Sequence, residues 1–306
     1  MKSQKQKSLT TKKKQEERTY RLFIFPALFI FCIVVVVPFF QGMYFSMTDW
    51  NGLMLGGQHF VGLKNFKDAL ADVRFNYSFR ITILYSVVNF LVINIVSFLL
   101  ALMVSSKLKG KNVYRAGFFL PNLIGGLVLG YIWKFIFNFV FTKFALPYFQ
   151  THLFLAEPKL AIIALLITST WQSAGYYMLI YYTALQNVPK ELEESAELDG
   201  AGRWQVIRNV VLPMIAPSIT VIFFLTMNSS FKTYDVLVSL TNAGPSTMWH
   251  GQAVNSTELI AFNIMQTGSV ENNMSLAQAK AVIFFILLTI LSVIQIKYNQ
   301  SKETEL

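Results

Sequence analysis

The sequence predicts an all-α, polytopic membrane protein with about six transmembrane helices. Of its 306 residues, 54% are hydrophobic and only 14% are charged, whereas soluble domains average about 25% charged residues. Six apolar runs are long enough to cross a bilayer, and the net charge of +10 is distributed as a membrane topology requires. This composition excludes a disordered chain, a secreted disulfide scaffold and an ordinary soluble enzyme.

The six apolar runs each reach the length that a spanning helix needs. The hydrocarbon core is about 30 Å thick and a helix rises about 1.5 Å per residue, so about 20 mostly apolar residues suffice. The sequence lacks the alternating ten-residue segments that mark a transmembrane β-barrel. In order, the predicted spans are Leu22–Phe45, Ile81–Val104, Gly117–Phe137, Ala161–Tyr182, Ile215–Tyr234 and Ala277–Ile296.

The basic residues indicate the orientation of the spans. Six spans place both termini on the same side of the membrane, and that side receives 17 of the 26 lysines and arginines, eight of them before residue 22. The positive-inside rule therefore predicts cytoplasmic N- and C-termini in a bacterial cell membrane. A nucleic-acid-binding tail is the competing explanation. Because topology and anionic lipid headgroups account for the charge, we expect the lipid bilayer, and no nucleic acid, as a partner.

Metal and catalytic motifs do not occur in the sequence. The single cysteine, Cys32, excludes an internal disulfide, and the three histidines lie far apart. Neither H-E-x-x-H, G-x-S-x-G nor a nucleotide-binding Walker A loop is present. We therefore expect no enzyme activity, no catalytic residues, no metal site and no cofactor bound by this chain.

The predicted cytoplasmic loop Asn187–Pro213 departs from the basic pattern. Its five acidic residues are Glu191, Glu193, Glu194, Glu197 and Asp199. Pro189 suits the first turn of a helix, and acids there favour the positive end of its dipole. Gly200 and Gly202 can end that helix before a second one starts near Trp204. The pattern predicts a helix–turn–helix that serves as a protein-docking surface; a merely solvated interhelical loop is the alternative.

The same loop carries a spaced motif: E-S-A, three residues, G, nine residues, then V-x-L-P. Glu194-Ser195-Ala196, then Gly200, then Val210-Val211-Leu212-Pro213 resembles the E-A-A, G, I-x-L-P pattern of the permease subunits of binding-protein-dependent ABC importers. The resemblance implies the type-I ABC importer permease fold, and a loop that forms the coupling helix in a groove of a cytoplasmic ATPase. The implied ATPase-coupling residues are Glu191, Glu194, Ala196, Asp199, Gly200, Ala201, Arg203, Trp204, Leu212 and Pro213.

Four other stretches resemble the sugar (maltose-type) permeases, in particular the first, larger permease subunit. They are Thr48-Asp49-Trp50, Phe60-Val61-Gly62-Leu63-Lys64-Asn65-Phe66, Phe118-Phe119-Leu120-Pro121 with Trp133 downstream, and Thr241-Asn242-Ala243-Gly244-Pro245. Together with the coupling loop they cover most of the chain from the first span to the sixth. The chain lacks that subunit's extra N-terminal spans and large external domain.

Polar residues gather in the fourth and fifth spans, which flank the coupling loop. Such residues are costly inside a membrane and mark substrate pathways, although hydrogen bonds between helices are the alternative reading for each of them. The resemblance places several of them at positions that contact sugar in the maltose permease. The predicted substrate-binding residues are Ser169, Trp171, Gln172, Ser173, Tyr176, Thr226, Ser229, Ser230, Thr233 and Asp235.

The expected function is a transmembrane permease subunit that translocates a carbohydrate, an oligosaccharide, delivered by an external binding protein. Its expected partners are a second, homologous permease, an ATPase dimer that binds ATP-Mg, and an extracytoplasmic sugar-binding protein. A permease for glycerol-3-phosphate or another polar solute is the alternative within the class. An ion-coupled secondary transporter, from a different class, should carry acids at mid-membrane, and the predicted spans contain none.

These expectations divide the chain into four segments. Residues 1–21 form a basic cytoplasmic tail, and residues 22–80 form the first transmembrane helix and an external loop. Residues 81–296 form the permease core, with the coupling loop at 187–213. Residues 297–306 form a second cytoplasmic tail.

Overall fold

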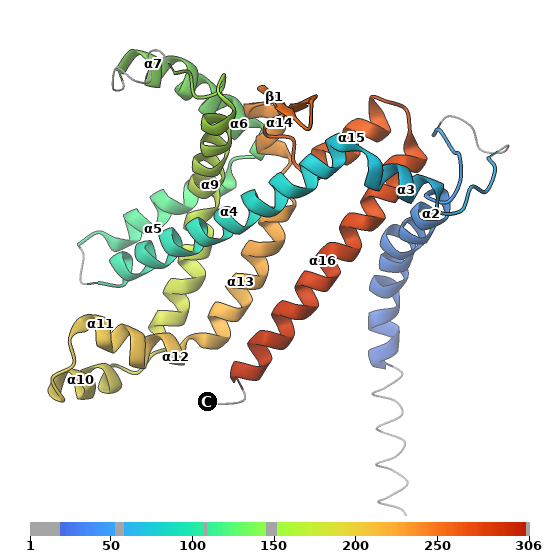
Figure 1. The fold of residues 1–306 in the computed structure, drawn as a ribbon. Coiled ribbons are helices and arrows are strands. Elements are labelled where there is room, and N and C mark those ends of the chain that lie inside the picture. Colours follow the sequence, from blue (N-terminus) through green and yellow to red (C-terminus); the bar gives the residue numbers. More distant parts are fainter. Residues whose placement is uncertain (1–18, 53–57, 107–108, 145–151, 304–306) are drawn as a thin grey trace, which may run out of the picture.

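The computed structural model describes residues 19–52, 58–106, 109–144 and 152–303, and most of them are helical (Figure 1). Most of the predicted tails therefore lies outside the described residues. The first half contains η1 (Cys32–Val36), α2 (Val37–Phe45), α3 (Lys64–Ala71), α4 (Val73–Ser105), α5 (Lys111–Phe119), η2 (Leu120–Leu123), α6 (Gly126–Phe135), η3 (Ile136–Val140) and α7 (Phe141–Phe144).

The second half contains three long helices and several short elements. The long helices are α9 (Pro158–Gln186), α13 (Ala216–Phe231) and α16 (Met274–Glu303). The short elements are α10 (Lys190–Leu198), α11 (Arg203–Val206), η4 (Ile207–Val211), α12 (Leu212–Met214), α14 (Asp235–Leu240), β1 (Ser246–Trp249), β2 (Gln252–Asn255) and α15 (Ile260–Ser269). Strands β1 and β2 form an antiparallel hairpin in which Trp249 pairs with Gln252.

Helices α4, α9 and α13 form the centre of the molecule (Figure 1). We call residues 190–214 the knob; it lies at one end of these helices, near the end of α16, and the hairpin lies at the other. One apolar core cluster at the hairpin end includes Tyr85, Leu165 and Leu237. A second cluster includes Ile93 and Ile222 and continues into the knob. Helices α4, α9 and α13 are thus joined to the knob by close packing.

The membrane-spanning character of the chain is evident in the described residues. Four helices there are long and apolar enough to cross a bilayer: Thr19–Phe45, Val73–Ser105, Gly126–Phe144 and Met274–Lys297. A fifth is added if Arg203–Met214 and Ala216–Phe231, bent by 78° to each other, count as one span. Helix α9 occupies the fourth predicted run, and at 29 residues it is about 43 Å long. Its polar residues lower its average apolarity.

The prediction of one continuous span over Gly117–Phe137 is wrong. Helix α5 ends at Phe119, a 3-10 turn follows, and α6 begins only at Gly126. Pro121 lacks the N–H that a continuing helix needs, and Gly125 adopts an extended ψ of 140°. The candidate span therefore starts at Gly126 and runs on to Phe144.

The fifth predicted run is also shorter than expected. The predicted span Ile215–Tyr234 follows a 78° bend after the short helix α12, which contains Pro213. Helix α13 ends at Phe231, and the separate helix α14 begins at Asp235. Residues 232–234 therefore connect two helices, which opens space beside α9.

Buried charged side chains join the elements at the hairpin end. Glu258, 1% exposed, accepts hydrogen bonds from Arg74 on α4 and from Asn263 on α15. Lys280 on α16, also 1% exposed, donates to Asp72 at 2.7 Å and to Asn263 at 3.1 Å. Because Asn263 bridges the two ion pairs, the charges form one continuous network.

Gly175 allows the chain at Phe118 to pack directly on α9, and we expect Gly175→Ala to destabilise the protein. A Cβ at Gly175 would overlap the backbone carbonyl of Phe118, which cannot rotate away as a side chain could. Overpacking of this kind costs about 1–3 kcal/mol. The thermal stability of the detergent-solubilised protein should fall. Gly117→Ala is the matched control, since no atom lies within 4 Å of its added Cβ; equal stability of the two variants would contradict this account.

Candidate functional site

The knob is a helix–turn–helix, as the loop sequence predicts. Helix α10 follows Pro189 and ends in a turn closed by two hydrogen bonds, from Ala201 N–H to the Ala196 carbonyl and from Gly200 N–H to the Glu197 carbonyl, each 3.0 Å. This is a Schellman motif, which requires a left-handed residue after the helix. Gly200 supplies it with a φ of +86°.

The two faces of the knob differ in exposure. Val206 and Val211 are buried in the core cluster shared with α4, α9 and α13. Leu198 and Trp204, by contrast, expose 89% and 66% of their surfaces. Two large apolar side chains left in the open on an acidic helix pair suit a protein-docking surface better than a solvated loop.

Most of the predicted coupling residues lie on this exposed side or in the turn. Glu191, Glu194, Asp199, Gly200, Arg203 and Trp204 are exposed. Ala196, Ala201, Leu212 and Pro213 are half-buried. The exposed set is accessible at the surface of the knob, and Ala196, Ala201 and Leu212 of the half-buried set pack against the second core cluster.

A polar cavity of about 270 Å³ lies between α9, the end of α13, the start of α14 and α4. It collects six of the ten predicted substrate-binding residues. These are Ser169, Gln172, Ser173, Ser229, Thr233 and Asp235. Lys232, at the connection after α13, also lines it, so the cavity contains one basic and one acidic side chain among hydroxyls and amides.

The other four predicted residues lie outside the polar cavity. Thr226 and Ser230 are buried and accept hydrogen bonds, each 2.9 Å, from Asn94 and Asn89 on α4. Trp171 packs edge-on against Trp133. Tyr176 is 40% exposed.

Helix α4 is the wall of the cavity that sequence analysis missed. Asn89 and Ile93 line the cavity, and the neighbouring Tyr85 hydroxyl lies 2.8 Å from Ser169 Oγ. Asn94, further toward the knob, accepts a hydrogen bond of 2.8 Å from Tyr181. A signal was available, since both asparagines interrupt the apolar run Ile81–Val104. Polar residues inside a predicted span were the criterion that pointed to α9 and α13, and Asn89 and Asn94 meet the same criterion.

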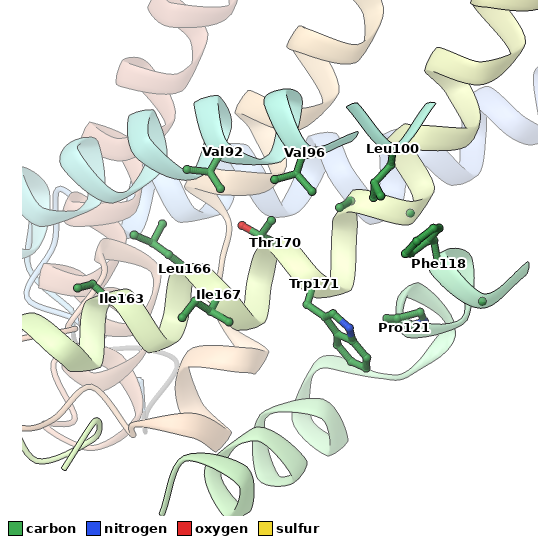
Figure 2. A pocket seen from close by; sticks show the side chains of 13 residues that line it. Val92, Val96, Leu100, Phe118, Pro121, Ile163, Leu166, Ile167, Thr170 and Trp171 are labelled. Carbon is green, nitrogen blue, oxygen red and sulfur yellow. The ribbon is translucent and has the colours of Figure 1, made fainter. Parts of the chain in front are cut away.

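A larger, apolar groove of about 570 Å³ lies on the opposite side of α9 (Figure 2). Figure 2 shows Val92 and Val96 of α4 facing Leu166 and Thr170 of α9, with Trp171 turned toward Pro121. Apart from Thr170 and Trp171 its labelled side chains carry no polar atom, so it does not suit a hydroxyl-rich solute. Within the described ranges, no group of His, Cys, Asp and Glu side chains is arranged to hold a metal ion.

The chain is similar to known transport proteins along most of its length. It is 41% identical over 292 residues to the probable starch degradation products transport system permease protein AmyD of Thermoanaerobacterium thermosulfurigenes, covering 94% of this chain and 96% of that protein. It is 29% identical to the multiple sugar-binding transport system permease protein MsmF of Streptococcus mutans, covering 92% and 95%.

The fold is that of a type-I ABC importer permease. The structure superposes with a TM-score of 0.75 on a chain of a bacterial ABC transporter involved in the import of the acidic polysaccharide alginate, covering 94% of this chain and 98% of that one at 19% identity. The family described as binding-protein-dependent transport system inner membrane component matches residues 76–303. The chain therefore belongs to this family of inner membrane transport components.

Proposed function

We propose that this chain is the transmembrane permease subunit of an ATP-driven importer for a carbohydrate, an oligosaccharide delivered by an external binding protein. One observation carries the proposal: α9 and α13 line the polar cavity and also hold the knob between their other ends. The core cluster that contains Val206 and Val211 of the knob also contains Ile93 of the cavity wall. Movement of the knob would thereby move the walls of the cavity.

The cavity chemistry favours a neutral, hydroxyl-rich solute. Serine and threonine hydroxyls and the Gln172 amide can donate to and accept from sugar hydroxyls. Lys232 and Asp235 supply one formal charge of each sign. The names of the relatives, which mention starch degradation products and multiple sugars, support the same class.

The proposal assigns partners to the two ends of the bundle. The exposed Leu198 and Trp204 would dock on a cytoplasmic ATPase dimer, which binds ATP-Mg and performs the hydrolysis. A second, homologous permease would complete the pathway, and an extracytoplasmic sugar-binding protein would deliver the substrate at the hairpin end. In this proposal the chain is a multi-pass protein of the bacterial cell membrane with both termini in the cytoplasm, and the ATPase subunits rather than this chain hydrolyse ATP.

Glycerol-3-phosphate, or another anionic solute, is the second candidate substrate because Lys232 lines the cavity. Asp235 in the same cavity opposes it, since a carboxylate repels a phosphate. An ion-coupled secondary transporter has no ATPase subunit, so that class does not account for the exposed Leu198 and Trp204 of the knob.

Reconstitution of the complete importer in proteoliposomes tests the proposal. Uptake of maltose, maltotriose or trehalose should require the binding protein, the ATPase and ATP, and glycerol-3-phosphate should not be taken up. Sugar uptake by the two permeases without the ATPase, or uptake of glycerol-3-phosphate alone, would contradict the proposal.

A further inference from the structure

We propose that Asn89 on α4 supplies a hydrogen-bond acceptor to a hydroxyl of the transported sugar, an inference that rests on the proposed function. Asn89 lines the polar cavity and is only 2% exposed. Its Nδ2 donates a hydrogen bond of 2.9 Å to Ser230 Oγ on α13. Its Oδ1 has no hydrogen-bond partner among the described residues.

An unpartnered amide oxygen is costly where Asn89 lies. Leaving a buried acceptor unsatisfied costs about 1–3 kcal/mol, and buried polar side chains in native proteins almost always have partners. Oδ1 has less than 1 Å² of accessible surface in this structure, so it gains a partner when a solute with a donor enters and the cavity walls move around it. A donor on the substrate then satisfies Oδ1 and removes the free-energy cost of the unpaired acceptor in the empty protein.

Asn94, five residues further along the same helix, provides an internal comparison. Its Nδ2 donates to Thr226 Oγ1 and to the Phe90 carbonyl, and its Oδ1 accepts from the Tyr181 hydroxyl. Asn94 thus uses both ends of its amide to tie α4, α9 and α13 together, and it does not line the cavity. The asparagine that lines the cavity is the one whose Oδ1 has no partner among the described residues.

The free acceptor narrows the class of substrate. Two other polar side chains of the cavity have protein partners: Ser229 Oγ lies 3.1 Å from the Tyr177 hydroxyl, and Gln172 donates to the Ile124 carbonyl. An amide oxygen accepts only, so the solute must offer a hydrogen-bond donor at this point. A sugar hydroxyl satisfies that condition, whereas a fully ionised phosphate oxygen or a deoxy carbon does not.

The test compares one transported sugar with its single-deoxy analogues. The complete importer is reconstituted in proteoliposomes, and uptake is measured at a saturating concentration of the binding protein loaded with maltotriose, or with whichever neutral sugar of the panel is transported. Saturation removes the affinity of the binding protein from the comparison. The chains compared are the unchanged permease, Asn89→Leu, Asn89→Ala and Ser230→Ala.

For the unchanged permease, uptake should fall about 3- to 10-fold with the analogue that lacks the interacting hydroxyl, the size expected of one hydrogen bond. Asn89→Leu should transport the parent sugar at that reduced rate and lose the discrimination. Asn89→Ala gives the same comparison without added bulk. Ser230→Ala removes the bond between the helices but keeps Oδ1, so it should keep the discrimination.

Two outcomes would overturn the inference about Asn89. In one, both Asn89 variants discriminate among the analogues as the unchanged permease does. In the other, Ser230→Ala loses the discrimination equally, which would make Asn89 only a tie between helices. Failure of the unchanged importer to transport any neutral sugar would instead overturn the proposed function, and this inference with it.

Discussion

Replacement of Gly200 by proline should reduce ATP-dependent sugar uptake to the background rate. Gly200 has a φ of +86°, whereas proline is fixed near −65°. The substitution also removes the N–H that donates to the Glu197 carbonyl. Together these changes cost about 3 kcal/mol or more locally. The turn must therefore open, and Leu198 and Trp204 no longer keep their positions relative to each other. Uptake in proteoliposomes and co-purification of the ATPase measure the effect.

Alanine variants separate the need for a left-handed backbone at Gly200 from a general sensitivity of the knob to substitution. Gly200→Ala must hold a left-handed residue, which costs about 1–2 kcal/mol, and should reduce uptake partially. Gly202→Ala carries the same change two residues later, where φ is −69° and the nearest atom to the added Cβ lies 3.6 Å away. It should transport normally. Unimpaired uptake by Gly200→Pro would rule out coupling through this turn.

The knob was predictable from the sequence because its structure is encoded locally. Pro189 precedes the helix, and Gly200 sits where the helix needs a left-handed residue. Hydrogen bonds between residues three to five positions apart close the turn. No distant part of the chain has to be known for such a prediction.

The break between α5 and α6 shows where apolar composition alone misleads. The run Gly117–Phe137 is long enough to span a bilayer, and length and apolarity do not register the change of direction at Pro121 and Gly125. Proline is tolerated near helix starts and in kinks as well as at breaks. Its presence therefore permits a broken helix without requiring one.

The polar cavity was predictable only in part. The fourth and fifth predicted spans were recognised because both flank the coupling loop, and six of the ten predicted residues do line the cavity, four of them on α9 and α13 and two just after α13. The contribution of α4 depends on packing between segments that are far apart in the sequence: Asn89 meets Ser230, and Tyr85 meets Ser169. The charge network is equally long-range, since Lys280 pairs with Asp72, 208 positions earlier.

Arg74→Leu should destabilise the protein by about 3–5 kcal/mol, the usual cost of removing one partner of a buried ion pair. Arg74 donates to both carboxylate oxygens of Glu258, at 3.0 and 3.2 Å, and Glu258 is 1% exposed. Without the guanidinium, the donors that remain to this buried carboxylate in the described part of the chain are the weaker amides of Asn255 and Asn263. The thermal stability of the solubilised importer should fall sharply.

Arg74 has a second carboxylate partner that serves as the control. Glu271 accepts from Arg74 at 2.8 Å, but its side chain is 41% exposed. Exposed pairs contribute about 0–1 kcal/mol, so Glu271→Gln should change stability little. Arg74→Leu combined with Glu258→Leu should recover part of the loss, because no charge then remains buried without a partner. A double variant less stable than Arg74→Leu would show that the hydrogen bonds of Glu258 to Asn255 and Asn263, rather than its unpaired charge, dominate this end of the bundle.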